Sequence, residues 1–389
     1  MSLPFSLKCY KRIALRYGWR GRLWVKHTIP PGFRFFMGQS TQSFRKKLYL
    51  CTKLTRNMEF YDVSDWLETV APSTKGTRDK LVLIKPQTDE TYFLKFPMVR
   101  EKRDYTPENW SEVLAYEIGH ALGFNVLRYD LAVYKGKVGC ISKNMTTPSN
   151  NESLVEGHSI LSRYDSTYDP SDKDTYNRYT FDFVQKALKN YDAGFFIKEF
   201  IRTLIFDAII GNSDRHQSNW GIIQSIKTIE VKPISRGIKL PFGKSKKPSL
   251  QLTLDITKKA APIYDSGCCL GREFGEQQIQ QHLDIQSKFD KYIRNGVSEL
   301  RTGETAKKPS HEELLRFIKS VNNGEWKLFI DEEINRVIQA YNPKEINELI
   351  LNIDKNLPDK YREKYGMSFA RKEFVFRVID TRIKNLKNI

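Results

Sequence analysis

The sequence predicts an α+β protein with two lobes, a small β-rich lobe followed by a larger, mainly helical lobe. Strand-like runs dominate as far as residue 141, and helical periodicity dominates from residue 192 onward. The 389 residues, 40% of them hydrophobic, suffice for a sizeable core, which excludes wholesale disorder. We assign residues 1–57 to a basic extension, 58–160 to the first lobe and 161–389 to the second.

The cysteines and the hydropathy of the sequence argue against a disulfide-rich protein, a zinc ribbon and a membrane-spanning protein. The five cysteines are an odd number without a C-x-x-C pair, which argues against a disulfide framework or a zinc ribbon. The most apolar stretch, 193–210, contains four charged residues, and cations interrupt the N-terminal segment. We therefore expect a cytoplasmic protein without a transmembrane segment or a classical signal peptide, and export as an effector stays an alternative.

The net charge of +18 is concentrated at the N-terminus. Residues 1–57 hold 13 of the 64 Lys and Arg residues and no acid, so the rest of the chain carries only +5. Because aromatic residues are interleaved with these cations, the extension is suited to contact nucleic acid or an anionic membrane. The alternatives are a solvated arm or a true start at Met58.

The first lobe is predicted to contain a β-hairpin, then a helix, then two more strands. Runs rich in β-branched and aromatic residues surround turn-forming residues, and the helix has its apolar residues on one face and Gly123 at its C-cap. The strands are expected at 81–84, 91–96, 126–134 and 137–141, and the helix at 108–122.

The second lobe follows a polar stretch, 146–179, that we predict to be a surface loop or an insert between the lobes. The helix predicted over 192–210 has apolar residues at i, i+4 spacing and ends at Gly211. A long insert, 224–259, is then expected to contain two short strands and a basic turn. These strands are predicted at 228–231 and 250–256 and the turn at 244–247, with later helices at 312–321, 330–341, 344–353 and 371–386.

The segment after Gly211 carries the most specific chemistry. Asp214 and Asn219 stand five residues apart, as do the base and the metal-binding amide of a phosphotransferase catalytic loop. An Asp at this place accepts the proton of an attacking hydroxyl, and the oxygen of the Asn suits Mg²⁺. His216 is a further candidate acid–base group, although we expect it to order the loop by hydrogen bonding.

A second metal ligand is predicted at Asp265, which lies 46 residues after Asn219 and forms a D-x-G turn with Gly267. Each motif arises readily by chance, but their order and their placement at the ends of elements strengthen the interpretation. The neighbouring Cys268 and Cys269 have no partner cysteine in reach and are predicted to be packing residues.

A nucleotide-phosphate contact is predicted at Lys95. This residue stands among apolar strand residues, so it requires an anionic partner if it is buried. Glu112 on the following helix can supply that partner, as the helix Glu does for the strand Lys of kinases. A solvent-facing Lys95 is the alternative, and Lys85 is a competing candidate.

Neither G-x-G-x-x-G nor a Walker-type motif occurs in the sequence, so another loop must cover the phosphates. We predict that this is the loop before the hairpin. Hydroxyl groups, cations and one glycine gather there and can contact phosphates, with a solvated turn as the alternative. The residues are Ser73, Thr74, Lys75, Gly76, Thr77 and Arg78.

Together these segments resemble the HipA-like protein kinases, bacterial serine/threonine kinases distantly related to lipid kinases. The resemblance implies a two-lobed kinase fold that uses ATP and Mg²⁺, with Asp214 as base and Lys95 at the phosphates. It also implies that Asn219 and Asp265 bind the metal and that Ser73, Thr74 or Thr77 can be autophosphorylated. It spans roughly residues 58–275 and is carried by 73–78, 92–95, 111–115, 121–123, 211–221 and 261–267.

The resemblance further implies a protein substrate. Members of the family often act as toxins that phosphorylate translation factors, and others are secreted effectors, so an antitoxin or a host protein is a further expected partner. The chain departs from the toxin pattern in residues 1–57, where no antitoxin-docking subdomain is recognisable, and in the long insert 224–259. Two other functions stay open: a non-catalytic kinase-fold module whose basic arm binds nucleic acid or protein, and a metal-dependent phosphohydrolase.

Overall fold

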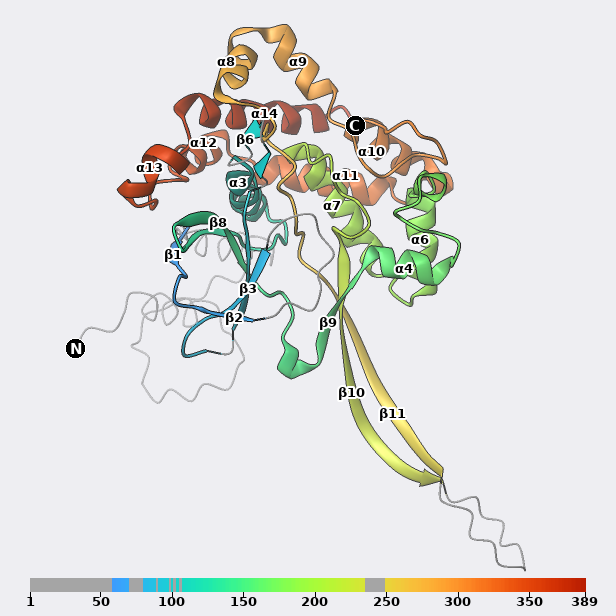
Figure 1. The fold of residues 1–389 in the computed structure, drawn as a ribbon. Coiled ribbons are helices and arrows are strands. Elements are labelled where there is room, and N and C mark those ends of the chain that lie inside the picture. Colours follow the sequence, from blue (N-terminus) through green and yellow to red (C-terminus); the bar gives the residue numbers. More distant parts are fainter. Residues whose placement is uncertain are drawn as a thin grey trace, which may run out of the picture. The chain divides into compact units, whose positions relative to one another are not determined.

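A six-stranded sheet forms the first part of the described structure (Figure 1). The computed structural model describes residues 58–69, 80–88, 90–97, 99–100, 103–104, 107–234 and 249–389. The basic extension 1–57, the predicted phosphate loop 73–78 and the basic turn 244–247 lie outside these residues.

The sheet has the order β1-β7-β8-β4-β3-β2, in which only β1 and β7 run parallel. Leu83 and Leu94 are fully buried from adjacent strands, which explains why this part of the chain pairs as the predicted hairpin. The strands are β1 Phe60–Asp62, β2 Leu67–Thr69, β3 Lys80–Ile84, β4 Thr91–Lys95, β7 Asp130–Tyr134 and β8 Lys137–Lys143. A separate pair joins β5 Val99–Arg100 to β6 Arg103–Asp104.

Helix α3, Pro107–Ala121, packs against β7 and β8. It is buried on almost every side, so even Glu108, Glu112 and Glu117 are withdrawn from solvent. The chain leaves the helix through Gly123, whose φ of 81° is the left-handed conformation that closes a helix, as predicted.

The prediction of a surface loop over 146–179 is wrong, and the alternative of an insert between the lobes stays a prediction. The segment contains the short 3-10 helix Pro148–Asn150, strand β9 Glu152–Glu156, helix α4 Gly157–Tyr164 and helix α5 Lys173–Tyr176. Strand β9 forms because β10, Gly221–Ile234, pairs with it, and α4 forms because Ile160 and Leu161 enter the core. The strand pairing and the core packing both involve residues far away in the sequence, so the polar composition of the segment could not reveal them.

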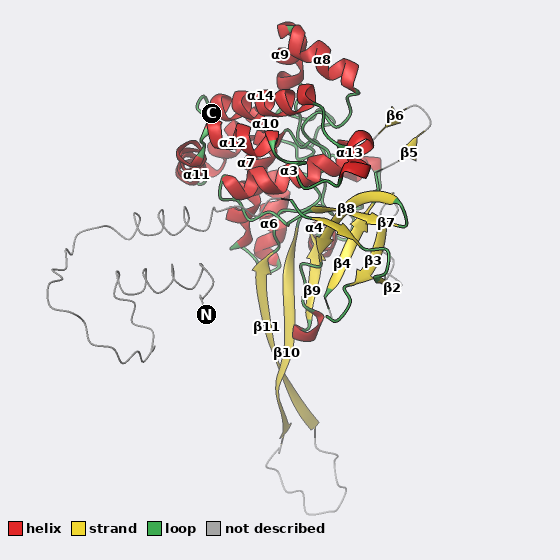
Figure 2. Cartoon of the chain, turned by 90° about the vertical axis from the view of Figure 1, so that its left-hand side faces the viewer, coloured by secondary structure: helices red, strands yellow, loops and turns green. Residues whose placement is uncertain are grey.

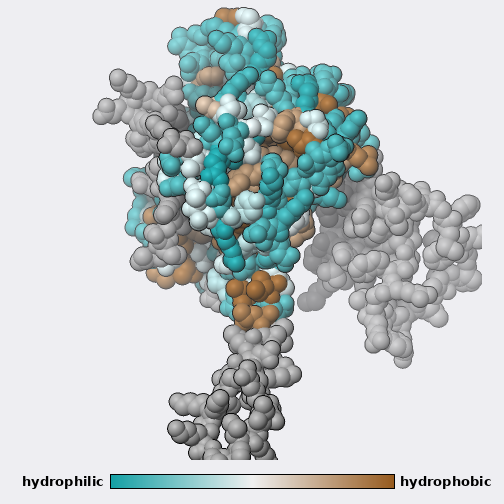
Figure 3. Space-filling view, turned by 90° about the vertical axis from the view of Figure 1, so that its right-hand side faces the viewer, coloured by the Kyte–Doolittle hydropathy of each residue, from teal (hydrophilic) through white to brown (hydrophobic). Residues whose placement is uncertain are grey.

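The long insert is a β-hairpin in which β10 pairs antiparallel with β11, Ser249–Ala260 (Figure 2). The strands are far longer than the two short runs predicted. Ile226, Leu254 and Ile256 are exposed and lie on one face of this hairpin, since Ile226 pairs with Ile256. Figure 3 shows a hydrophobic patch on the hairpin, below a helical region whose surface is mostly hydrophilic.

The helical part is organised around α7, Phe196–Ile210, which contacts α6, α10, α11 and α14 and is almost entirely buried. It starts later than predicted, because Asp192 has a left-handed φ of 55° that a helix cannot contain. It ends at Gly211, as predicted, with φ 69°. The other helices are α6 Phe181–Asn190, α8 Glu276–Asp284, α9 Gln286–Arg294, α10 His311–Ser320, α11 Lys327–Ala340, α12 Pro343–Leu351, α13 Asp359–Tyr365 and α14 Phe369–Leu386.

The predicted α+β class with a β-rich first part and a helical second part is therefore confirmed. The described residues all lie in one compact unit that begins at Thr55, and the boundary at residue 160 between the lobes stays a prediction. In the part of the chain that the structure describes, no helix is both long and apolar enough to cross a membrane.

Candidate active site

Two carboxylates from distant parts of the chain, those of Glu112 and Asp265, lie beside the ammonium group of Lys95. Its Nζ lies 2.9 Å from Oδ1 of Asp265 and 3.7 Å from Oε1 of Glu112. Lys95 is the last residue of β4, Glu112 lies on α3, and Asp265 follows β11, so the sheet, the helix and the long hairpin each supply one group. Lys95 is 16% exposed, so it does not face solvent. The competing candidate Lys85 has no ion pair with a described residue.

The Asp265 turn is held in place from two sides. Asp265 has a left-handed φ of 56°, a conformation that Asp tolerates better than most residues, and its backbone N–H donates to Oη of Tyr129 at 3.4 Å. The next backbone N–H, of Ser266, donates to Oε2 of Glu112 at 2.9 Å. A Cβ at Gly267 would lie 3.2 Å from the carboxylate of Glu112, so the glycine permits this close approach.

Burial and charge act in opposite directions in this cluster. Burial by itself lowers the pKa of Lys95, but the carboxylates of Asp265 and Glu112 outweigh it and hold that pKa above its usual value. Burial raises the pKa of Glu112 to about 7, because desolvation of the carboxylate exceeds the attraction of Lys95. Lys95 is therefore a permanent cation, which is the form that binds phosphate.

The loop that carries Asp214 is organised by Arg215, whose side chain is 1% exposed. Its guanidinium donates two hydrogen bonds of 2.9 Å to the carboxylate of Asp207 on α7. It also donates to the backbone oxygens of Asn219 and Tyr264, at 2.6 and 2.5 Å. One side chain thus ties the end of α7, the Asp214 loop and the Asp265 turn together. This role of Arg215 was not predicted from the sequence, although Asp207, an acid in the last turn of an otherwise apolar stretch, was a signal for it.

Asp214 is held at both its backbone and its side chain. Its N–H donates to Oδ1 of Asn212 at 3.3 Å, and its carbonyl accepts from Nδ2 of Asn219 at 2.8 Å. Its carboxylate oxygen Oδ2 accepts a hydrogen bond from Sγ of Cys268 at 3.1 Å. The prediction that Cys268 is only a packing residue is therefore wrong, whereas Cys269 is buried as expected.

His216 lies in the same loop, and its Nδ1 accepts a hydrogen bond from the backbone N–H of Ser218 at 3.2 Å. No contact between His216 and the Asp214 carboxylate occurs among the described residues. This geometry agrees with the expectation that His216 orders the loop, and any acid–base role for it stays a prediction.

The residues present fit a hard divalent cation. The amide nitrogen of Asn219 is used by the carbonyl of Asp214, so its oxygen is the atom left to bind a metal. Asp265 supplies a carboxylate, and within the described residues no cluster of three His, Cys, Asp or Glu side chains forms a closed metal cage. A pair of oxygen ligands without a cage is typical of Mg²⁺ that is shared with a nucleotide.

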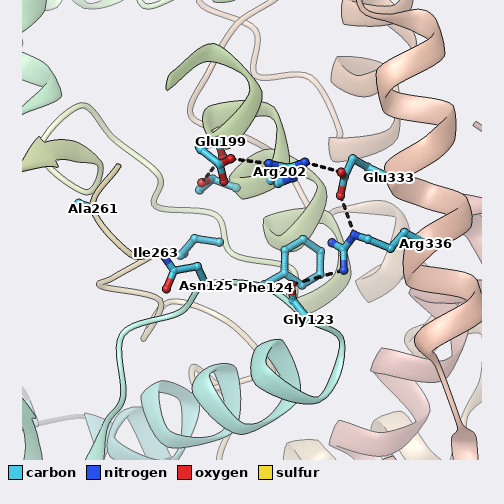
Figure 4. Close-up of a pocket in the computed structure, with 10 residues that line it drawn as sticks. Gly123, Phe124, Asn125, Glu199, Arg202, Ala261, Ile263, Glu333 and Arg336 are labelled. Carbon is cyan, nitrogen blue, oxygen red and sulfur yellow. Dashed lines mark hydrogen bonds and ion pairs between the residues drawn. The ribbon is translucent and has the colours of Figure 1, made fainter. Parts of the chain in front are cut away.

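A cavity of about 270 Å³ lies away from these residues, between the end of α3, α7 and α11 (Figure 4). Its charged groups are already paired: Glu333 binds Arg202 at 2.6 Å and Arg336 at 2.8 Å, and Arg202 also pairs with Glu199. Figure 4 shows these acids and arginines alternating in a row, so each arginine of the row is paired with a carboxylate. We assign this cavity a structural role.

Known proteins are similar to this chain in sequence and in fold. A family model described as the HipA-like C-terminal domain matches residues 72–234. The serine/threonine-protein kinase CtkA of Helicobacter pylori is 24% identical over 303 residues, which cover 76% of each chain. The crystal structure of a Helicobacter pylori proinflammatory kinase CtkA matches with a TM-score of 0.62 at 24% identity, covering 85% of this chain and 97% of that one.

A structure of the Shewanella oneidensis toxin–antitoxin system HipA and HipB with operator DNA gives a TM-score of 0.41 at 11% identity, covering 92% of this chain and 74% of that chain. The match to CtkA confirms the predicted two-lobed kinase fold. Residues 72–234 of the chain thus match the HipA-like C-terminal domain, and the described residues have the kinase fold seen in CtkA.

Proposed function

We propose that the protein is an ATP- and Mg²⁺-dependent serine/threonine protein kinase. The observation that carries the proposal is the convergence of Lys95, Glu112 and Asp265 from three elements. A strand Lys paired with a helix Glu, beside an Asp in a D-x-G turn, is the arrangement with which kinases bind nucleotide phosphates. The name of the relative, a serine/threonine-protein kinase, supports the same reaction.

In this proposal Lys95 binds the phosphates of ATP and Glu112 positions Lys95. Glu112 can do so because its other oxygen is fixed by the N–H of Ser266. Asn219 and Asp265 would hold Mg²⁺, which neutralises charge on the transferring phosphoryl group when it is bound. The loop 73–78 is the proposed cover of the phosphates and lies outside the described residues.

Asp214 is the proposed base. The acceptor hydroxyl gives its proton to the Asp214 carboxylate while its oxygen forms the new bond to the γ-phosphorus, and the bond between that phosphorus and the bridging oxygen of ADP breaks. The hydrogen bond from Cys268 occupies one side of Oδ2 and so fixes the direction in which the carboxylate faces. Arg215 positions the loop without contacting the substrate.

The regulation, the substrate and the partners of the proposed kinase are predictions that the geometry of the site does not test. Autophosphorylation at Ser73, Thr74 or Thr77 stays a prediction. The family relationship supports a protein substrate, and a translation factor, an antitoxin and a host protein are the candidates. Nucleic acid binding is proposed only for residues 1–57, and toxin or effector action is a prediction that the relatives motivate.

The test is transfer of ³²P from [γ-³²P]ATP to the protein itself and to proteins of a lysate. We expect labelling by the wild type and its loss in Asp214→Asn and Asp265→Asn. Asp255→Asn, the same substitution at an exposed position of β11, is the matched control and should label normally. Labelling that survives in Asp214→Asn contradicts the proposed base. A wild type that neither binds ATP nor labels any protein contradicts the kinase function, and release of free phosphate alone identifies a phosphohydrolase.

A further inference from the structure

A second, larger cavity of about 510 Å³ adjoins the proposed base. Ser213, which directly precedes Asp214, and Cys268, which donates to the Asp214 carboxylate, both line it. Its other walls come from α8, α9 and α14, the helices at the top of Figure 1. Asp214 itself does not line the cavity, but its neighbour Ser213 and its hydrogen-bond partner Cys268 do, so the cavity lies beside the proposed base.

The charged groups of this cavity are mostly cations. Arg272, Lys288, Lys291 and Arg382 line it, against a single acid, Glu273. Arg272 is already paired with Glu108 on α3 at 3.0 Å. Lys288 donates to the neutral amide of Gln281 at 2.8 Å, and Lys291 is exposed at the rim, so neither forms an ion pair with a described residue.

Arg382 is the unusual member of the set. Its side chain is 93% buried, yet within the described part of the chain it forms no ion pair and no hydrogen bond, and its Nε is a buried donor without an acceptor. Arg215 binds Asp207, and Arg371 binds Glu276 and two backbone oxygens. Arg301 is also buried with an unpartnered Nε, but its Nη1 donates to the backbone oxygen of Glu299. A buried guanidinium that no carboxylate contacts is costly, so an anion supplied from outside the chain would stabilise it.

The backbone around Arg382 is shaped to admit it. A Cβ at Gly211 would lie 3.0 Å from its Nη2, and a Cβ at Gly296 only 2.6 Å from the same atom. The guanidinium is therefore seated between two glycines, with the ring of Tyr292 5.9 Å from it. Burial lowers the pKa of Arg382, and the charges of Glu312 and Glu273, neither of which forms an ion pair with it, do not offset this effect.

We propose that this cavity binds an anionic side chain of the protein substrate, a carboxylate or a phosphate, close to the serine or threonine that accepts the phosphoryl group. The nature of the ligand rests on the proposed kinase function, because the cavity adjoins the base. The anion pairs with Arg382 inside and with Lys288 and Lys291 at the rim. The kinase thus prefers acceptor sites flanked by acidic or phosphorylated residues.

The first test measures anion binding without catalysis. The full-length Asp214→Asn variant, saturated with Mg²⁺ and a non-hydrolysable ATP analogue, is titrated with O-phosphoserine and with N-acetylglutamate while its thermal unfolding is followed. We expect stabilisation, with an affinity that Lys291→Gln weakens about threefold or more. Arg294→Gln, on the same helix but outside the cavity, removes the same charge and should have no effect. Equal weakening by both substitutions, or no stabilisation at all, overturns the proposal.

The second test distinguishes a ligand site from a structural arginine. In the absence of anions, Arg382→Met should keep or raise the melting temperature, because it removes an uncompensated buried charge while it preserves volume. The same substitution should abolish the stabilisation by O-phosphoserine. A melting temperature that falls by several degrees, with anion binding retained, shows a structural role and overturns the proposal.

The third test measures selectivity in peptide phosphorylation. A serine peptide library with Glu, phosphoserine, Gln or Lys fixed at each flanking position is offered to the wild type, Lys291→Gln and Arg294→Gln. We expect KM to be about tenfold lower for the best Glu or phosphoserine position than for Gln, with kcat little changed, and the preference to shrink only in Lys291→Gln. The better of the two anions identifies the ligand.

The outcomes separate this inference from the kinase proposal. Peptide labelling without a Lys291-dependent acidic preference overturns the inference and leaves the kinase function in place. Lys291-dependent binding of O-phosphoserine by a protein that transfers no phosphate overturns the kinase function and keeps the anion site. Binding of an RNA oligonucleotide that depends on Lys291, without any peptide preference, overturns the peptide as the ligand.

Discussion

The guanidinium of Arg215 and the carboxylate of Asp207 form a doubly hydrogen-bonded ion pair in which each side chain is 1% exposed. The pair connects the last turns of α7 to the loop that carries Asp214. From the same guanidinium, further hydrogen bonds reach the carbonyls of Asn219 and Tyr264, so one ion pair positions both proposed metal-binding segments.

Breaking this pair should therefore be costly. We expect Asp207→Asn to lower the free energy of unfolding by about 3–5 kcal/mol, because it leaves the guanidinium buried and uncompensated. Glu199→Gln, on the same helix but in a partly exposed pair with Arg202, is the matched control and should cost less than about 1 kcal/mol. Urea denaturation measures both values. Similar losses in the two variants would show that Arg215 is not the organising residue.

The Lys95 cluster predicts a sharp contrast between two lysines of the same hairpin. Lys95→Met should reduce the rate of phosphoryl transfer at least about 100-fold, because it removes the cation that lies between Asp265 and Glu112. Lys85→Met should retain the rate of the wild type. Initial rates of ³²P incorporation at saturating ATP provide the measurement, and equal rates for the two variants would remove Lys95 from the proposed site.

The contact between Cys268 and Asp214 predicts sensitivity to thiol reagents. Alkylation of Cys268 by N-ethylmaleimide should block transfer, because the added group would lie beside Oδ2 of Asp214, 3.1 Å from the sulfur. Cys140 and Cys269 are buried and should react slowly, and Cys9 and Cys51 are replaced by Ser for this experiment. Cys268→Ser should remain active and become resistant. Inactivation of that variant at an unchanged rate would place the sensitive thiol elsewhere.

The buried His311 predicts how stability responds to acid. Burial, followed by the charge of Arg382, lowers the pKa of His311 to about 3 from the usual 6.5. Between these values the unfolded chain binds a proton that the folded protein does not, so the contribution of His311 to stability is present above pH 6.5 and is lost as the pH falls. The stability of the wild type relative to His311→Gln should decrease by up to about 1.4 kcal/mol per pH unit below pH 6.5. A difference that does not change with pH would contradict a neutral, buried His311.

Local patterns predicted those parts of the fold whose signal lies within a few residues. The hairpin of β3 and β4, helix α3 and the end of α7 at Gly211 all fall close to where turn residues, helical periodicity and glycine placed them. The prediction for the segment 146–179 was wrong because its structure depends on residues far away in the sequence. Its strand and helix exist because β10 and the core lie beside them, and neither contact leaves a local pattern.

The sequence by itself determined the order of Lys95, Glu112, Asp214, Asn219 and Asp265 along the chain and the chemistry that these residue types permit. Only the tertiary structure decided which of them meet, because contacts across 170 residues depend on how the sheet, α3 and the long hairpin pack. It also placed Cys268 against Asp214 and left Arg382 buried beside the same loop, without a hydrogen bond or ion pair to any described residue. Burial changes the energy of a charge, and burial is a property of the packed chain rather than of any short segment.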